Sequence, residues 1–350
     1  MAQVNEELVK KVFDEMIKHK PSLAKHLIAD EDDPNETVDT RVLADLTIKH
    51  FPWPIGVELR RLFSGSMRQL NHGRLDQLFK TIERTMQFLS FVMIAQLWEE
   101  KIKKNFELPK DYSDQFKNRF NVLSLGNYTW LIRATGNLFE KLSIEPFMPE
   151  MKEMLNNKFY QSLDFWVPER NEIGHYQINL SDEEIQKRCV EYEDKLAFIL
   201  QNISFIIKYK LVTIREIKVL KNKHKGAKFN HVMDLLNNSD SDFKATEMQH
   251  DIFADSNCVL LMKDFKVPNE FLNLSPLVID TRPEIIDTKE KFNLKKDIFM
   301  YTKFVNEKLM YVGTEISEKC DLTPLSNYAM LVEQFKDLVA SFTSSENVNV

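Results

Sequence analysis

The chain has 350 residues, of which 43% are hydrophobic and 29% are charged, and its formal net charge is −6. This composition is that of a globular protein with about two or three domains, and the negative charge excludes a protein that coats nucleic acid with its whole surface. No run of about 18 apolar residues occurs, so we expect no transmembrane helix and no membrane partner. The charged N-terminus and three widely spaced cysteines (Cys189, Cys258 and Cys320) predict a cytoplasmic protein without disulfides.

The first half of the sequence predicts helices. Residues 1–50 predict an N-terminal arm of two helices around an acidic loop at residues 30–35. The segment FPWPIG at residues 51–56 interrupts the helical pattern and indicates a boundary. Residues 51–210 predict a helical bundle, because apolar residues recur every three or four positions along two long segments. The two apolar seams are Leu75, Leu78, Ile82, Met86, Leu89, Met93 and Leu97, and Ile185, Cys189, Tyr192, Leu196, Ile199, Ile203 and Ile206.

The second seam has its own start signal. Ser181 with Glu184 three residues later is typical of a capping box at a helix N-terminus. The heptad-like spacing behind it favours helices packed nearly antiparallel.

The sequence pattern changes after residue 210. Alternating, β-branched segments predict a smaller β-rich domain over residues 211–342, with a hairpin turn at Asn306 and Glu307 and one closing helix. Residues 343–350 predict a disordered tail. The expected fold class is therefore mainly α, an antiparallel helical bundle followed by a smaller β-rich (α+β) C-terminal domain.

One polar constellation stands out in the bundle, in the segment RNEIGH that begins at Arg170. The imidazole of His175 could move the proton of a ribose 2′-hydroxyl that attacks its own phosphate. The guanidinium of Arg170 could bind the phosphate oxygens, and Asn171 could orient either group. Pro168 and Gly174 suit the start and the end of a helix. A break at Gly174 would let His175 turn back, whereas on an unbroken helix the two side chains point about 140° apart and would face a second subunit instead.

RNEIGH resembles the R-N-x-x-x-H signature of the HEPN superfamily (higher eukaryote and prokaryote nucleotide-binding), and the upstream SLGNYTWLIRA resembles the second conserved helix of its abortive-infection-type members. The resemblance covers roughly residues 70–210. It implies a helical bundle, a composite site at a homodimer interface, and a metal-independent endoribonuclease that leaves a 2′,3′-cyclic phosphate, commonly a toxin or phage-defence effector. It implies Arg170 and His175 as the catalytic pair with Asn171 beside them. It also implies an acid from a neighbouring helix, for which Glu83 is the candidate and Asp164 the alternative.

No metal or other cofactor is expected, since the histidines show no HxxxH or HxH pairing. The expected partner is RNA, and a basic stretch over residues 208–228 could contact it, because lysine and arginine neutralise phosphates with little sequence specificity. A solvated hairpin face is the alternative. The candidate RNA-binding residues are Lys208, Lys210, Arg215, Lys218, Lys221, Lys223 and Lys225.

Structural and functional alternatives stay open at this point. Arg170 could pair with its neighbours Glu169 or Glu172, and Glu83 could be a solvated surface acid. A non-catalytic HEPN-like module would dimerise and bind a nucleotide or RNA. A third class is an antitoxin-like regulator whose acidic residues 1–40 mask a basic groove. A regulatory ligand or protein could bind the C-terminal domain of the nuclease.

Overall fold

The structure, a computed structural model, describes residues 5–27, 39–176, 180–236, 245–250, 257–282 and 295–343. The side chains of residues 173–176 and 245–250 are not among those described, and the expected acidic loop at residues 30–35 and the tail from residue 344 lie outside the described residues. The chain forms two compact units, and each is built from segments that are far apart in the sequence. The first unit comprises Met1–Met86, Met148–Lys210 and Leu236–Phe243, and the second comprises Gln87–Phe147, Leu211–Leu235 and Lys244–Val350.

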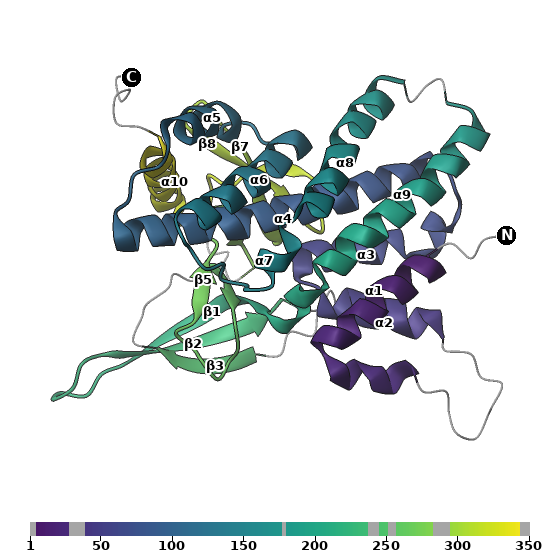
Figure 1. Cartoon of the computed structure of the whole chain (residues 1–350). Coiled ribbons are helices and arrows are strands. Elements are labelled where there is room, and N and C mark those ends of the chain that lie inside the picture. Colours follow the sequence, from purple (N-terminus) through teal and green to yellow (C-terminus); the bar gives the residue numbers. More distant parts are fainter. Residues whose placement is uncertain are drawn as a thin grey trace. The chain divides into compact units, whose positions relative to one another are not determined.

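The secondary structure confirms the expected fold class (Figure 1). Helices dominate the chain as far as residue 208, and the first strand begins at Lys210. The division of the sequence into an arm, a bundle and a C-terminal domain stays a prediction.

The first unit is helical in its described residues. Helix α1 packs against α2 and α9, and α2 packs against α3. The elements are α1 (Glu6–His19), the 3-10 helix η1 (Pro21–Leu27), α2 (Thr40–His50), α3 (Trp53–Leu62), η2 (Gly65–Arg68), the first part of α4 (His72–Lys104), α7 (Met151–Met154), α8 (Asn157–Tyr176), α9 (Asp182–Asn202) and η4 (Ser204–Lys208).

Both predicted apolar seams are buried. Every seam residue on α4, and every seam residue from Ile185 to Ile206, is buried. Burial of one such side chain stabilises the fold by about 1.5–3 kcal/mol. The seam of α9 therefore decides which face of that helix turns inward, whereas on α4 every residue from Arg84 to Leu97 is buried.

The predicted capping box at the start of α9 is also confirmed. The Ser181 hydroxyl accepts from the backbone N–H of Glu184 at 3.3 Å, and the Glu184 carboxylate accepts from the backbone N–H of Ser181 at 3.0 Å. These contacts satisfy two donors that the first turn of a helix leaves unpaired.

We expect Ser181→Ala to lower the free energy of unfolding by about 1 kcal/mol, because the cap acceptor is lost. Ser124→Ala is the matched control, since Ser124 stands at the N-cap of α6 (Leu125–Lys141) but the structure describes no side-chain cap hydrogen bond for it. Urea unfolding measures the loss of unfolding free energy in both variants, and we expect unchanged m-values. Equal losses in the two variants would contradict the role of the Ser181 cap.

Of the two geometries that the sequence leaves open at Gly174, the structure excludes the helix break. Helix α8 continues from Asn157 to Tyr176 and includes both Pro168 and Gly174. An interior proline costs a helix about 3 kcal/mol, but α8 fully buries Phe159 and Trp166. Tertiary packing of this apolar face outweighs the local signals.

The second unit combines helices with two sheets. The first sheet has the strand order β3-β2-β1-β4-β5, and the second has the order β6-β7-β8-β9. Its remaining elements, apart from the end of α4, are α5 (Lys110–Phe120), α6 (Leu125–Lys141), β1 (Lys210–Leu220), β2 (Lys228–Leu235), β3 (Ala245–His250), β4 (Val259–Met262), β5 (Phe271–Asn273), β6 (Val278–Asp280), β7 (Ile298–Val305), β8 (Lys308–Gly313), β9 (Lys319–Asp321) and α10 (Tyr328–Phe342).

The predicted hairpin turn joins β7 and β8. Asn306 and Glu307 have φ angles of 51° and 59°, and Val305 pairs with Lys308 across the turn. Positive φ at both central residues is the conformation of a type I′ turn, which matches the twist of the strands.

Candidate functional site

Glu83 on α4 and Arg170 on α8 form an ion pair within the first unit. Nη2 of Arg170 lies 3.1 Å from Oε2 and 3.5 Å from Oε1 of Glu83, so one guanidinium nitrogen donates to both carboxylate oxygens. The two side chains remain 43% and 31% exposed, with the larger value for Arg170. The structure thus brings together the arginine of RNEIGH and the acid expected from a neighbouring helix, at a place that solvent reaches.

An aromatic contact one helical turn earlier positions this pair. The rings of Phe79 and Trp166 meet edge to face with centroids 5.6 Å apart. Glu83 and Arg170 each follow four residues later, so they lie on the same helix faces as the two rings. Tyr192 of α9 contacts both rings, at 5.5 Å and 5.7 Å. The ion pair therefore lies beside a core of three buried aromatic rings.

The acids beside Arg170 in sequence bind α9 instead. Glu169 accepts from the hydroxyl of Tyr192 and lies 3.6 Å from Nη1 of Arg188, while Nη2 of Arg188 donates to Glu172 at 2.7 Å. Burial first, and then the Glu169 carboxylate, raises the pKa of Tyr192, which keeps its proton for this contact. Glu169 and Glu172 thus contact α9, whereas Arg170 forms its ion pair with Glu83 on α4.

The other residues of the motif lie on the same helix. Asn171 and Asp164 are exposed on α8. The backbone of His175 is helical, and its side chain is not among those described. On a continuous helix, positions 171 and 175 lie on one face, whereas positions 170 and 175 lie about 140° apart around the axis. With α8 unbroken, the geometry in which His175 turns back towards Arg170 is wrong, and the two-subunit geometry stays a prediction.

The basic candidates do not form one uniform set. Lys208 forms an ion pair with Glu150, and Arg215 lies 3.7 Å from Asp234. Lys208 and Lys210 belong to the first unit, and the other five belong to the second. Of those five, Lys218 lies 3.6 Å from Glu216, and Lys221, Lys223 and Lys225 are exposed.

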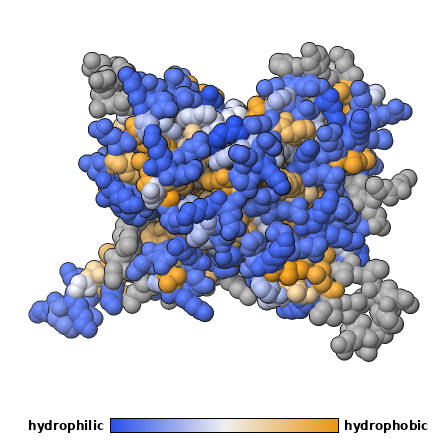
Figure 2. All heavy atoms as spheres, in the orientation of Figure 1, coloured by the Kyte–Doolittle hydropathy of each residue, from blue (hydrophilic) through white to orange (hydrophobic). Residues whose placement is uncertain are grey.

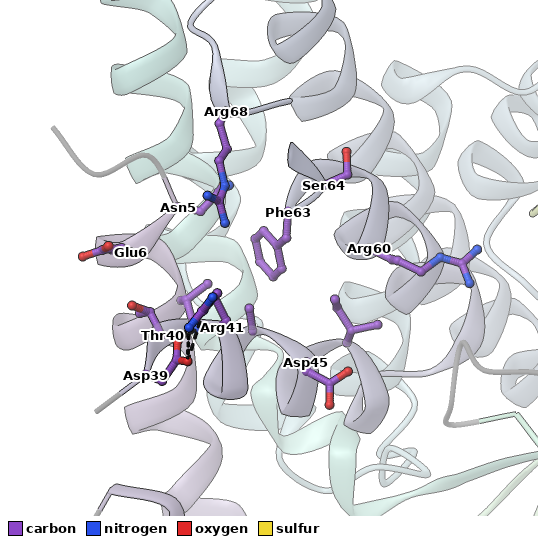
Figure 3. Close-up of a pocket in the computed structure, with 13 residues that line it drawn as sticks. Asn5, Glu6, Asp39, Thr40, Arg41, Asp45, Arg60, Phe63, Ser64 and Arg68 are labelled. Atoms are coloured by element: carbon purple, nitrogen blue, oxygen red, sulfur yellow. Dashed lines mark hydrogen bonds and ion pairs between the residues drawn. The ribbon is translucent and has the colours of Figure 1, made fainter. Parts of the chain in front are cut away.

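Sequence reasoning missed a cavity of about 810 Å³ between α1, α2, α3 and η2. Figure 3 shows the Phe63 ring pointing into it, with Arg41 and Arg68 near its edges. Arg41 donates to both oxygens of Asp39, and Asp45 pairs with Lys49 at 2.9 Å. The lining residues come from separate segments, so no local motif could indicate the cavity. Its charges are mixed in sign and partly paired, so they do not select one ligand chemistry.

Comparison of the chain with protein-family models, with curated proteins and with solved structures found no match. The resemblance to the HEPN superfamily therefore stays a prediction. Among the described residues, no helix is long and apolar enough to cross a membrane. In the same part of the chain, no three His, Cys, Asp or Glu side chains gather in a way that could hold a metal ion.

Proposed function

We propose that this protein is a metal-independent endoribonuclease of the kind that its resemblance to the HEPN superfamily implies. The observation that most supports the proposal is the exposed Glu83–Arg170 ion pair, 3.1 Å long, between two packed helices. A guanidinium held by a carboxylate is oriented before a substrate arrives, and its free N–H groups suit phosphate oxygens. An arginine on a disordered loop would first have to lose conformational freedom before it could bind a phosphate.

In the proposed reaction, the ribose 2′-oxygen attacks the adjacent phosphorus, the O2′–P bond forms and the P–O5′ bond breaks. His175 accepts the 2′-hydroxyl proton. Arg170 binds the non-bridging oxygens and stabilises the charge that develops on them. Glu83 positions Arg170 and does not contact the phosphate. The products are a 2′,3′-cyclic phosphate and a 5′-hydroxyl end, for which the leaving oxygen takes up a proton.

The continuous α8 favours a site shared by two copies of the chain. Positions 170 and 175 of a continuous helix lie about 140° apart around its axis, so one copy of the chain is poorly arranged to bring both side chains to one phosphate. A two-fold axis near α8 would place Arg170 of one copy beside His175 of the other. The same separation favours the alternative function, a non-catalytic dimer that binds RNA or a nucleotide through Arg170 alone.

Incubation of the full chain with mixed RNA in EDTA, followed by analysis of product ends, tests the proposal. We expect 2′,3′-cyclic phosphate ends from the wild type. We expect Glu83→Gln to reduce cleavage by about 10- to 100-fold, because a misoriented group loses that much rate. Asp194→Asn is the control, since it removes an exposed acid that pairs with Lys11 elsewhere. A dimer that binds RNA without cutting it would support the non-catalytic alternative instead.

A further inference from the structure

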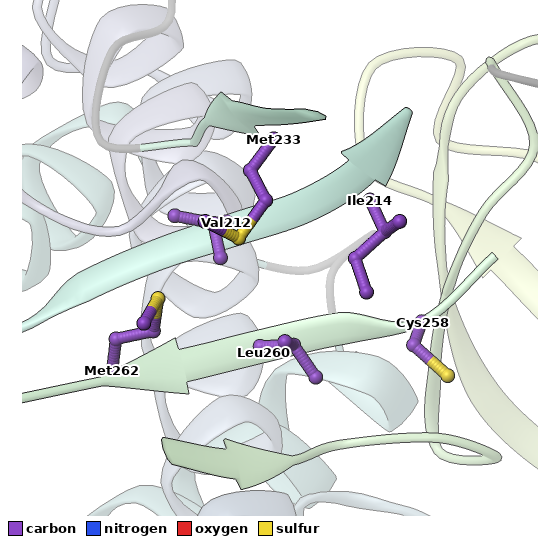
Figure 4. Packing of buried hydrophobic residues seen from close by; sticks show 6 residues of the cluster. All are labelled: Val212, Ile214, Met233, Cys258, Leu260 and Met262. Atoms are coloured by element: carbon purple, nitrogen blue, oxygen red, sulfur yellow. The ribbon is translucent and has the colours of Figure 1, made fainter. Parts of the chain in front are cut away.

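The β1–β2 hairpin has a buried root and an exposed tip. At the root, Val212, Ile214 and Met233 belong to the buried apolar cluster of the first sheet (Figure 4). The two strands stay paired as far as Leu220 and Lys228, so the ribbon is hydrogen-bonded up to its final turn. Figure 1 shows this end extending beyond the other strands of its sheet. The tip thus lies at the end of a hydrogen-bonded ribbon whose root is buried.

This tip carries an excess of positive charge. Residues 215–228 contain six lysine or arginine residues and a single acid, Glu216. Every residue from 215 to 228 except Ile217 is exposed. The part of the surface that this hairpin end forms is mostly hydrophilic (Figure 2). Closely spaced like charges repel one another, and a polyanion relieves that repulsion. In the part of the chain that the structure describes, no ion pair is formed by Lys221, Lys223, Lys225 or Lys228.

The two faces of the ribbon differ in chemistry. Lys218 pairs across the strands with Asn230, and Lys228 pairs with Leu220 on the same face, two pairs nearer the turn. Val219, which is 60% exposed, pairs with the half-buried Phe229 on the opposite face. A single strand of RNA offers phosphates to the first face and base surfaces to the second.

A membrane is a poorer occupant for the same tip. The exposed apolar residues Val219 and Leu220 are consecutive on a strand, so they point to opposite faces. The turn at residues 221–227 has no large apolar side chain. Membrane-surface segments gather apolar side chains on one face, which this hairpin does not do.

We propose that the tip of the β1–β2 hairpin is an arm that binds single-stranded RNA, mainly through its phosphates. The choice of RNA over DNA rests on the proposed function, whereas the attraction for a polyanion follows from the charges alone. The arm gives affinity with little sequence preference, because lysines contact the backbone and not the base edges.

The test measures binding of the full chain to a labelled 2′-O-methyl oligoribonucleotide, which cannot be cleaved by 2′-hydroxyl attack. The variant is Lys221→Gln, Lys223→Gln and Lys225→Gln combined. If each lysine neutralises one phosphate, the slope of log K against log salt should become less steep by about 2, and affinity at low salt should fall on the order of 100-fold. The control, with the same change in net charge, combines Lys117→Gln, Lys141→Gln and Lys266→Gln, all exposed in the same unit. We expect it to keep the wild-type slope.

Three outcomes would overturn the proposal. These are an unchanged slope in the hairpin variant, an equal loss in the control, and a loss of binding to phosphatidylserine vesicles without a loss for the oligonucleotide. A DNA strand of the same sequence bound more tightly than RNA would overturn the choice of RNA. The result is separable from the proposed function, because Glu83→Gln should cleave natural RNA more slowly and keep the wild-type salt slope.

Discussion

Replacement of Arg170 by lysine should reduce RNA cleavage by about 100- to 1,000-fold, the loss typical when one donor to a developing oxyanion is removed. Lysine keeps the positive charge but lacks the planar fork of N–H groups that can contact Glu83 and a phosphate together. Because the charge develops in the transition state, we expect kcat to fall more than KM rises. Single-turnover cleavage in EDTA, with product-end analysis, measures this change.

The same substitution should leave the fold intact. An exposed ion pair contributes about 0–1 kcal/mol to stability, and the Arg170 side chain is 43% exposed. Arg41→Lys is the matched control, since Arg41 is an exposed arginine that donates to both oxygens of Asp39. We expect wild-type cleavage from it. Equal cleavage by wild type and Arg170→Lys would make the Glu83–Arg170 contact a surface ion pair without a catalytic role.

The parts of the fold that the sequence predicts correctly depend on neighbouring residues. The seam on α9, its capping box at Ser181 and the turn at Asn306 each follow from residues a few positions apart. Such signals need no knowledge of the tertiary fold. The pairing of Glu83 with Arg170 is different, since 87 positions separate them. Only the resemblance to a family suggested an acid near Arg170, and the Phe79–Trp166 contact explains why Glu83 is within reach of its guanidinium.

The errors and omissions arise where distant packing decides the outcome. Pro168 and Gly174 are local signals for helix ends, but burial of Trp166 keeps α8 continuous through both. The buried Arg74 was not anticipated at all. An arginine near a helix start gives no local indication that it will contact Glu193, 119 positions away.

Arg74 gives the largest expected effect on stability. Its side chain is fully buried in the first unit. Nη2 donates to Glu193 and, at 2.9 Å, to Asn5, while Nη1 donates to the carbonyl of Met67 at 2.7 Å. The backbone N–H of Asn5 also donates to Glu193 at 2.9 Å. One guanidinium therefore connects the start of α1, the turn at η2 and α9.

Arg74→Met should lower the free energy of unfolding by about 3–5 kcal/mol, because it leaves the Glu193 carboxylate without its partner in a largely buried place. Urea unfolding at constant pH measures the loss. The double variant Arg74→Met with Glu193→Gln should be more stable than Arg74→Met alone, since the uncompensated charge is then absent. This order would separate the cost of a buried charge from the loss of packing around the arginine stem.

A neighbouring ion pair provides the control for this effect. Lys11 and Asp194 also connect α1 to α9, at 3.1 Å, but their side chains are 39% and 63% exposed. Water and salt screen that pair, so Lys11→Met should cost at most about 1 kcal/mol. Equal losses from Lys11→Met and Arg74→Met would show that burial adds nothing to the Arg74 contacts. A loss several-fold larger for Arg74 would identify its network as the main polar connection between α1, α4 and α9.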